Sequence, residues 1–214
     1  MTTDALQYLN RRCKIMRRLI RDHGPCTLVP DSRRSPFESL VRAVAHQQLH
    51  GVAAESILRR FRALFPTRRF PRAEQLAAVP DAALRGAGFS FAKIRALRDI
   101  AEKTITGVVP SSRAIRLMPD DEIIERLTQV RGVGRWTVEM LLIFKLGRPD
   151  VLPVDDFGVR NGFRIAFGLS DLPLPKEVLA YGKRWRPHAT TAAWYLWRAA
   201  DRAHEKKAIA GVNA

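Results

Sequence analysis

The sequence has few cysteines, no long hydrophobic run and too few acidic residues to balance its basic ones. Its two cysteines, Cys13 and Cys26, cannot build a disulfide framework and exclude a four-cysteine zinc or iron–sulfur site. No apolar stretch approaches the roughly 20 residues that a membrane-spanning helix needs. The N-terminus has no signal-peptide core, because residues 8–10 lead straight into Arg11 and Arg12. We therefore expect reduced thiols, a cytoplasmic or nucleoid (intracellular) setting and no membrane-embedded partner.

The shortage of acidic residues leaves a large positive charge. Lysine and arginine number 37 against 21 aspartate and glutamate residues, giving a net charge of +16 and a pI near 11.0. A compact protein with this excess attracts polyanions over about one Debye length, ~8 Å in physiological salt. Nucleic acid is the first candidate partner, and an anionic membrane surface is the second.

The apolar pattern is helical, and no convincing alternating strand is present. Near the N-terminus apolar residues recur at spacings of three and four: Leu6, Leu9, Cys13, Met16 and Leu19. This spacing predicts one amphipathic helix that ends at the loop beginning with Gly24. Ser35 has the features of an N-cap, with Pro36 at the first helical position and Glu38 at the third.

The fold expected from this pattern is all-α. At 214 residues with 46% hydrophobic content, the chain can form one sizeable domain, or two small helical lobes that share a cleft. We expect a single domain over residues 1–214 with two lobes, one from roughly 1–35 with 150–214 and the other from 36–149. A helical hairpin is expected at 120–146.

The centre of this hairpin is a Gly-Val-Gly turn between two amphipathic helices. Gly132 and Gly134 allow φ values that other residues resist, and their missing side chains let a phosphate approach the backbone. Val133 between them would anchor the hairpin in the core or press on a sugar edge. In a basic chain this pattern favours DNA contact over a corner that needs glycine only for shape. The residues expected to contact DNA here are Arg131, Gly132, Val133, Gly134, Arg135 and Thr137.

Two carboxylates follow the hairpin. Asp155 and Asp156 lie after a turn at Pro153 and before a helix that begins near Phe157. One of them is expected to cap that helix. The other could stabilise a cationic sugar or activate a water when a glycosidic bond breaks, and could also orient a base or bind a metal.

Together these residues resemble a known family. The run from Leu127 to Arg160 is similar to the helix–hairpin–helix, the Gly/Pro-rich loop and the aspartate of a DNA glycosylase superfamily, within it most to 3-methyladenine DNA glycosylase II. Trp136 stands where relatives that also cleave the backbone carry a lysine. The resemblance therefore implies a monofunctional enzyme that uses water as the nucleophile and leaves an abasic site. We expect no zinc or redox cofactor and no metal-binding side chain, although the resemblance allows an alkali cation among the hairpin carbonyls.

The resemblance also assigns roles to the two carboxylates. The family's catalytic aspartate corresponds to Asp156, twenty positions after Trp136, and Asp155 then becomes the cap or support. Residues 37–49 and 186–198 are similar to the family's early helix and its final pocket helix, so the resemblance covers roughly 36–200. The chain lacks the separate N-terminal β-domain of longer members and the cysteines of the iron–sulfur branch.

A target base inside a duplex must be extruded before its glycosidic bond can be reached. The resemblance implies that Gln48 or Leu49 fills the gap that the base leaves. A glutamine could hydrogen-bond the orphan base, while a leucine would only stack. The alternative for Gln47, Gln48 and His50 is a polar helix end that faces water.

The extruded base is expected to enter an aromatic pocket. A methylated purine is a cation, and the electron-rich face of an aromatic ring attracts cations. The candidates are Trp136 and Trp197, with Phe157 and Tyr195 behind them. Ordinary core packing is the alternative for each ring, least so for Trp136 because it adjoins the hairpin.

The sequence therefore predicts a monomeric glycosylase that acts on alkylated bases in double-stranded DNA. A non-catalytic helix–hairpin–helix protein, a bifunctional glycosylase/lyase and an anionic-membrane binder remain as alternatives. Which modified purines are accepted stays open, because pocket width depends on side-chain rotamers.

Overall fold

The computed structural model describes residues 3–49, 51–67 and 69–212, and every regular element in these ranges is helical. The predicted all-α class is confirmed. The chain divides into two compact units: unit 1 comprises Met1–Pro30 with Leu142–Ala214, and unit 2 comprises Asp31–Leu141. These boundaries differ by a few residues from those expected for the two lobes. His50 lies outside the described residues.

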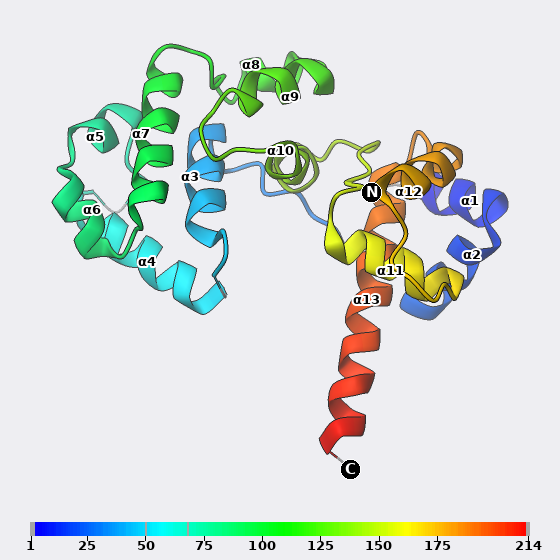
Figure 1. Ribbon diagram of the computed structural model, residues 1–214. Coiled ribbons are helices and arrows are strands. Elements are labelled where there is room, and N and C mark those ends of the chain that lie inside the picture. Colours follow the sequence, from blue (N-terminus) through cyan, green and yellow to red (C-terminus); the bar gives the residue numbers. More distant parts are fainter. Residues whose placement is uncertain (1–2, 50, 68, 213–214) are drawn as a thin grey trace. The chain divides into compact units, whose positions relative to one another are not determined.

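Unit 2 contains the first eight helices after the N-terminal pair (Figure 1): α3 (Pro36–His46), α4 (Gly51–Ala63), α5 (Ala73–Ala78), α6 (Asp81–Ala87), α7 (Phe91–Ile105), α8 (Ala114–Leu117), α9 (Asp120–Thr128) and α10 (Arg135–Leu141). The predicted start of α3 is confirmed. Ser35 is its N-cap, and the Oγ of Ser35 accepts a hydrogen bond from the backbone N–H of Glu38 at 3.0 Å. Pro36 occupies the first turn, where a missing N–H costs nothing.

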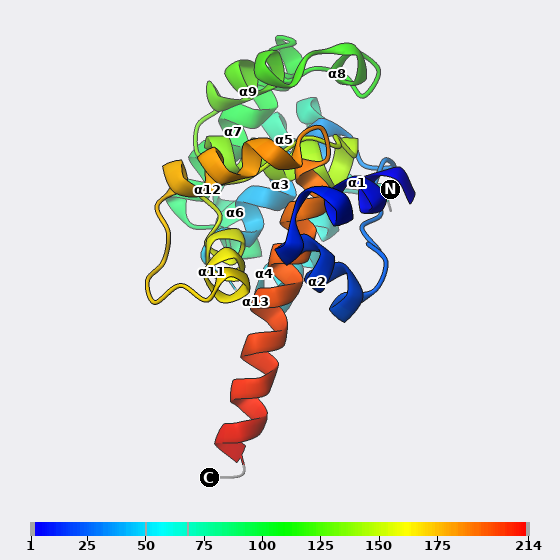
Figure 2. The ribbon, with the colours of Figure 1, turned by 90° about the vertical axis from the view of Figure 1, so that its right-hand side faces the viewer.

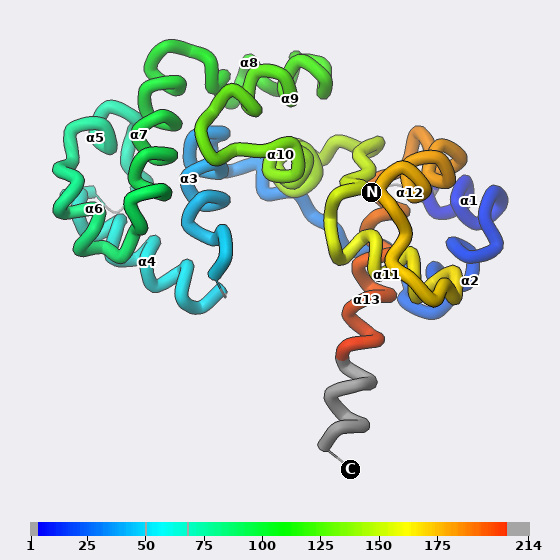
Figure 3. Tube along the Cα trace, viewed as in Figure 1, coloured from blue at the N-terminus to red at the C-terminus, as the bar shows by residue number. Residues whose placement is uncertain are grey.

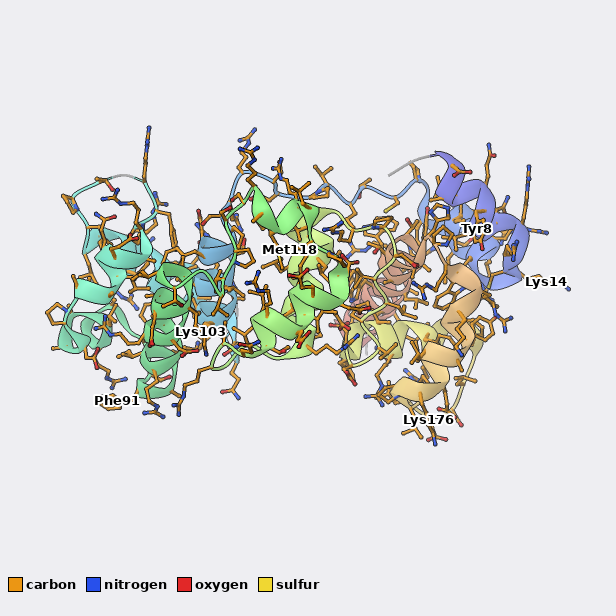
Figure 4. The ribbon with its side chains drawn as sticks, turned by 90° about the horizontal axis from the view of Figure 1, so that it is seen from above. Tyr8, Lys14, Phe91, Lys103, Met118 and Lys176 are labelled. Atoms are coloured by element: carbon orange, nitrogen blue, oxygen red, sulfur yellow. The ribbon has the colours of Figure 1, made fainter. Side chains whose placement is uncertain are left out.

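Helix α7 is the central element of unit 2. It packs against α3, α5 and α6, and it buries Ile94, Leu97 and Ile100 completely or almost so. Ser90 caps its first turn by accepting a hydrogen bond from the N–H of Lys93. Phe91 is its first residue and Lys103 lies in its last turn, and both are labelled in Figure 4. The end of α7 near Lys103 reaches the turn between α9 and α10, where Lys103 donates to the carbonyl oxygen of Gln129.

The expected hairpin at 120–146 is present: α9 and α10 form its two arms, and a further helical segment continues α10. Helix α9 begins with Asp120 and Asp121, whose charge suits the N-terminal end of a helix, and α9 packs against α10. Helix α10 passes directly into a π-helical segment, η1 (Leu142–Leu146), which belongs to unit 1.

Unit 1 also contains α1 (Thr3–Arg12), α2 (Lys14–His23), α11 (Phe157–Phe167), α12 (Pro175–Gly182), η2 (Lys183–Trp185) and α13 (Ala189–Val212), traced in Figure 3. The single N-terminal helix expected from apolar spacing is wrong. Cys13 has an extended backbone (φ −144°, ψ 114°), so the chain turns there. Because of the turn, α1 and α2 bury their apolar faces in the same core, with Leu9 and Met16 fully inaccessible.

The main packing contact of unit 1 joins α11 and α13, which cross in Figure 1 and lie side by side in Figure 2. Gly162 makes this approach possible, because a Cβ at Gly162 would lie 1.9 Å from the carbonyl oxygen of Leu196. Phe163, on the same helix, is buried and stacks on Phe167 at 4.0 Å between ring centroids. The close contact fixes the first turn of α11 beside the side chains of α13.

Candidate functional site

The two glycines of the hairpin turn differ in conformation. Gly132 has φ +76°, which L-residues rarely adopt, and a Cβ there would lie 3.2 Å from the Cβ of Ala96 on α7. Gly134 is not among the glycines with positive φ, and a Cβ there would meet nothing within 4 Å. The expectation that both glycines need unusual φ values is therefore wrong for Gly134. Gly132 shapes the turn against α7, whereas Gly134 leaves open space over the backbone.

Helix α7 holds the turn from one side. The Oδ2 of Asp99 accepts a hydrogen bond from the backbone N–H of Arg131 at 2.6 Å. The same oxygen forms an ion pair with the Nζ of Lys103 at 2.9 Å. Lys103 also donates to the carbonyl oxygen of Gln129. Burial alone would raise the pKa of Asp99, but the Arg131 amide and Lys103 together hold that pKa below its usual value.

Helix α3 holds the turn from another side. The side-chain Nε2 of Gln47, which ends α3, donates to the carbonyl oxygen of Gly132 at 2.8 Å. Lys93 of α7 donates to the carbonyl oxygen of Ala45 at 2.8 Å, and burial lowers the pKa of Lys93. Between α3, α7 and the turn lies a cavity of about 750 Å³, whose lining includes Gln47, Gln48, Lys93, Arg131, Trp136 and Met140.

The side chains of the hairpin divide into buried and exposed groups. Val133 is 4% exposed, so of its two expected roles the structure gives it the core anchor. Thr137 is 6% exposed and lines the cavity. Arg131 and Trp136 are exposed, as is Arg135, whose Nε pairs with the Oε1 of buried Glu139 at 3.0 Å. The surface available to a partner therefore consists of two arginines, one indole and the open backbone at Gly134.

The loop after α3 carries the two plug candidates. Gln48 has φ +56° and is the one non-glycine residue with positive φ in the described part of the chain. Both Gln48 and Leu49 are exposed. The end of α3 is tied to α4 by a contact of 3.1 Å between the Nε2 of His46 and the Oε1 of Glu55. A strained, exposed residue on an anchored loop is typical of a functional contact.

In unit 1, Asp156 is the N-cap of α11. Its Oδ1 accepts a hydrogen bond from the N–H of Val159 at 2.8 Å and another from the indole Nε1 of Trp197 at 2.7 Å. Asp155 is exposed in the preceding turn. The expectation that Asp155 is the cap is therefore wrong, because the chain enters α11 one residue later. Asp156, the residue that the resemblance designates as catalytic, is therefore also the cap of α11.

The aromatic residues near Asp156 differ from the expected set in two ways: Tyr195 is absent from the site and Phe144 is added. Trp197 is half-buried and stacks on Phe144 with ring centroids 5.5 Å apart, and Phe157 is 64% exposed. Tyr195 is wrong as a pocket residue: it is fully buried, and its hydroxyl donates to the carbonyl oxygen of Gly24 at 2.7 Å. Burial raises the pKa of Tyr195 to about 12. Phe144 was not anticipated, because its position within a helix gives no local signal.

Gly158 was also not anticipated as part of this site. A Cβ at Gly158 would lie 2.8 Å from the Cδ1 of Trp197 and 3.0 Å from the Oδ1 of Asp156. The missing side chain therefore makes room for the indole to reach the carboxylate. Its spacing of four from Gly162 places both glycines on the face of α11 that meets α13, a pattern that the sequence does contain.

The predicted site residues fall into two groups. Unit 2 holds the hairpin, the plug candidates and Trp136, while unit 1 holds Asp156, Trp197 and Phe157. Across residues 3–49, 51–67 and 69–212, no cluster of three or more histidine, cysteine or carboxylate side chains is arranged to hold a metal ion. Within the same ranges, none of the helices has the length and apolar character that a membrane crossing requires.

A known protein family matches most of the region that carries these candidate residues. A family model described as "HhH-GPD superfamily base excision DNA repair protein" matches residues 41–187, which include the hairpin, Asp156 and most of unit 2. The chain belongs to this superfamily. The HhH-GPD assignment confirms the helix–hairpin–helix fold that the Gly-Val-Gly turn indicated.

Individual HhH-GPD relatives match almost the whole chain. DNA-3-methyladenine glycosylase 1 of Schizosaccharomyces pombe is 40% identical over 204 residues, covering 95% of this chain and 89% of the relative. The structure of the S. pombe 3-methyladenine DNA glycosylase Mag1 with abasic DNA superposes with a TM-score of 0.82 at 41% identity, covering 92% and 96% of the two chains. A crystal structure of a DNA-3-methyladenine glycosidase from Bacillus halodurans superposes with a TM-score of 0.86 at 33% identity, covering 95% and 92%.

Proposed function

We propose that this protein is a monofunctional DNA glycosylase of base excision repair. It hydrolyses the N-glycosidic bond of extruded, alkylated purines of the 3-methyladenine type and leaves an abasic site. The observation that carries this proposal is the Asp156 carboxylate, fixed at the start of α11 by the indole of Trp197, in a chain that also has the DNA-binding hairpin of its superfamily. The enzyme acts as a monomer in the compartment that holds genomic DNA.

The hairpin binds the duplex through its backbone. The first amides of a helix have no partner within that helix, and at the turn before α10 they lie next to the open space over Gly134. Arg131 and Arg135 add side-chain contacts to phosphate. Such contacts position a duplex without reading its sequence, which suits an enzyme that must find a lesion in any context.

Gln48 fills the gap that the extruded base leaves. Its positive φ holds it in a conformation that an isolated chain disfavours, and the loop projects it into solvent. Its amide can hydrogen-bond the orphan base, which the exposed Leu49 cannot do. Extrusion costs a few kcal/mol, and less for a damaged or poorly paired base, so this plug contributes to selectivity as well as to rate.

Asp156 carries the chemistry. As the glycosidic bond breaks, positive charge develops on the deoxyribose, and an ionised carboxylate held in a fixed orientation stabilises that charge. The two donors on Oδ1, from Val159 and Trp197, fix this orientation before the substrate arrives. Asp156 also positions the water that attacks the sugar. Alkylation makes the purine a cationic leaving group, so no partner acid is needed.

The aromatic residues recognise the base. Trp197, Phe144 and Phe157, all in unit 1, offer ring faces that attract a cationic purine, and Trp136 of unit 2 is a separate exposed indole. Trp136 also excludes lyase chemistry, because it occupies the position of the lysine that attacks the sugar in bifunctional relatives.

The proposal is tested by incubating the protein with methylated duplex DNA and identifying the released material by chromatography. We expect free methylated purine, with strand nicking that appears only after alkali. Binding without base release would instead support a non-catalytic helix–hairpin–helix protein. Nicking before alkali, with a covalent adduct trapped by borohydride, would support a bifunctional glycosylase/lyase.

A further inference from the structure

We propose that Gln47 is a positioning residue. Its side chain fixes the plug loop, which carries Gln48 and Leu49, relative to the hairpin turn. A duplex bound to the hairpin therefore meets Gln48 in a defined position. This inference rests on the proposed function. It goes beyond that function by assigning base extrusion to a specific link between two DNA-contacting segments. The link is the hydrogen bond from the Nε2 of Gln47 to the carbonyl oxygen of Gly132, 2.8 Å long and spanning 85 residues of sequence.

The position of Gln47 suits this role. It is the C-cap of α3, with an extended ψ of 128°, and its own N–H still donates to the carbonyl oxygen of Ala43 at 3.2 Å. Its backbone therefore belongs to α3 while its side chain reaches the hairpin. The next residue is Gln48, whose φ of +56° needs support from its surroundings to persist.

Beside the Gln47 side chain, a backbone bond from the N–H of Leu49 to the carbonyl oxygen of His46, 3.2 Å long, closes the loop on itself, and the side-chain contacts near it hold the helices. His46 pairs with Glu55 on α4, and Lys93 binds the carbonyl of Ala45, so both contacts fix the last turn of α3. The side chain of Gln47, in contrast, reaches the turn at Gly132. The hairpin end of this link is itself rigid, because Asp99 holds the N–H of the neighbouring Arg131.

The variant Gln47→Met tests the link, because methionine keeps the length of the side chain and removes its donor. Base release is measured in single turnovers from a duplex with the methylated purine normally paired, and from a duplex with the same lesion opposite an abasic site, where extrusion costs less. We expect base release from the paired duplex to slow about tenfold, because the variant loses one hydrogen bond. Release from the duplex with the unpaired lesion should change less than threefold. A 2-aminopurine beside the paired lesion should show a smaller rise in fluorescence on binding.

Matched controls separate this link from a general effect on the fold. Gln7→Met makes the same change at an exposed position of α1 and should leave both rates unchanged. If Gln47→Met lowers Tm by more than a few degrees, Gln47→Glu repeats the test with a polar side chain of equal length that donates no hydrogen bond at neutral pH.

Equal slowing on both substrates, or no slowing on either, would overturn the role of Gln47 while leaving the glycosylase intact. If the unaltered protein releases no base from either substrate, the proposed function itself fails.

Discussion

The hairpin of unit 2 and the acid turn of unit 1, which carries Asp155 and Asp156 before α11, are built in different ways. The hairpin is a stretch of backbone held from outside, by Asp99 and Lys103 of α7 and by Gln47 of α3. The acid turn is a single side chain held by its own helix and by one indole, through Val159 and Trp197. Under the proposed function, duplex binding then depends on a supported backbone surface, and base release depends on one oriented carboxylate.

This difference matters for how each region responds to mutation. A backbone surface with several supports loses affinity gradually when one support is removed. A carboxylate that owes its orientation to two donors loses activity sharply when one donor or its space is lost. The expected effects below follow this division, from the largest to the smallest.

Gly162→Ala should give the largest effect on stability and would extend the comparison to the packing beneath the acid turn. The added methyl would lie 1.9 Å from the carbonyl of Leu196, so α11 must move away from α13. We expect a loss of about 3 kcal/mol and a fall in Tm of about 6–12 °C by calorimetry. Gly86→Ala, where a Cβ meets nothing within 4 Å, is the control and should leave Tm unchanged or slightly higher. An unchanged Tm for Gly162→Ala would mean that the stability of unit 1 does not depend on the close contact between α11 and α13.

Trp197→Phe should slow base release about tenfold without weakening duplex binding. Phenylalanine keeps an aromatic ring but cannot donate to the Oδ1 of Asp156, and a hydrogen bond to a charged group contributes about 1.5–3 kcal/mol. Single-turnover rates measure the effect. Trp194→Phe, on the same helix but outside this contact, should leave the rate unchanged. If the two variants behave alike, the indole N–H has no role in the chemistry.

Arg131→Ala should affect binding and leave the chemical step intact. Removing one exposed phosphate contact should weaken duplex affinity a few-fold and reduce the slope of log K against log salt by about 0.9. Fluorescence anisotropy at several salt concentrations measures both. The rate of base release at saturating enzyme should equal that of the unaltered protein. A large fall in that rate would show that the hairpin also contributes to the chemical step.

Asp99→Asn should give the smallest effect, and its pH dependence identifies the cause. The pKa of Asp99 is lowered in the fold, so its charge stabilises the protein above the unfolded pKa of about 3.9, and this contribution is lost as pH falls through the folded value. At pH 7 we expect a loss of about 1 kcal/mol, or 2–4 °C in Tm. The difference between the two proteins should shrink below about pH 4. A difference that is constant with pH would assign the effect to shape rather than charge.

The hairpin could be predicted from the sequence because its signal is local. Glycine spacing, flanking arginines and acidic residues at the start of α9 all lie within one stretch, and the structure has its helices where that stretch indicated. The supports could not be predicted, because Asp99 and Gln47 lie 32 and 85 residues from their partners. The sequence identified both carboxylates but misassigned the cap, since one residue of register decides which one begins α11.

The aromatic set shows the same limit. Trp197 and Tyr195 are two residues apart on one helix, so they point in different directions: Trp197 towards Asp156 and Tyr195 into the core. The type of side chain alone does not show which of the two faces the site. Phe144 joins the site from a π-helical segment, whose extra residue per turn shifts the face on which a side chain lies.

The central claim is that Asp156 performs the chemistry while the hairpin binds the duplex. The direct test is the single-turnover rate of base release by Asp156→Asn from a methylated duplex at saturating enzyme. Asparagine is as good an N-cap as aspartate, so α11 is preserved while the charge is lost. We expect the rate to fall about 10²–10³-fold, with duplex affinity within twofold of the unaltered protein. An unchanged rate would show that the carboxylate takes no part in breaking the glycosidic bond.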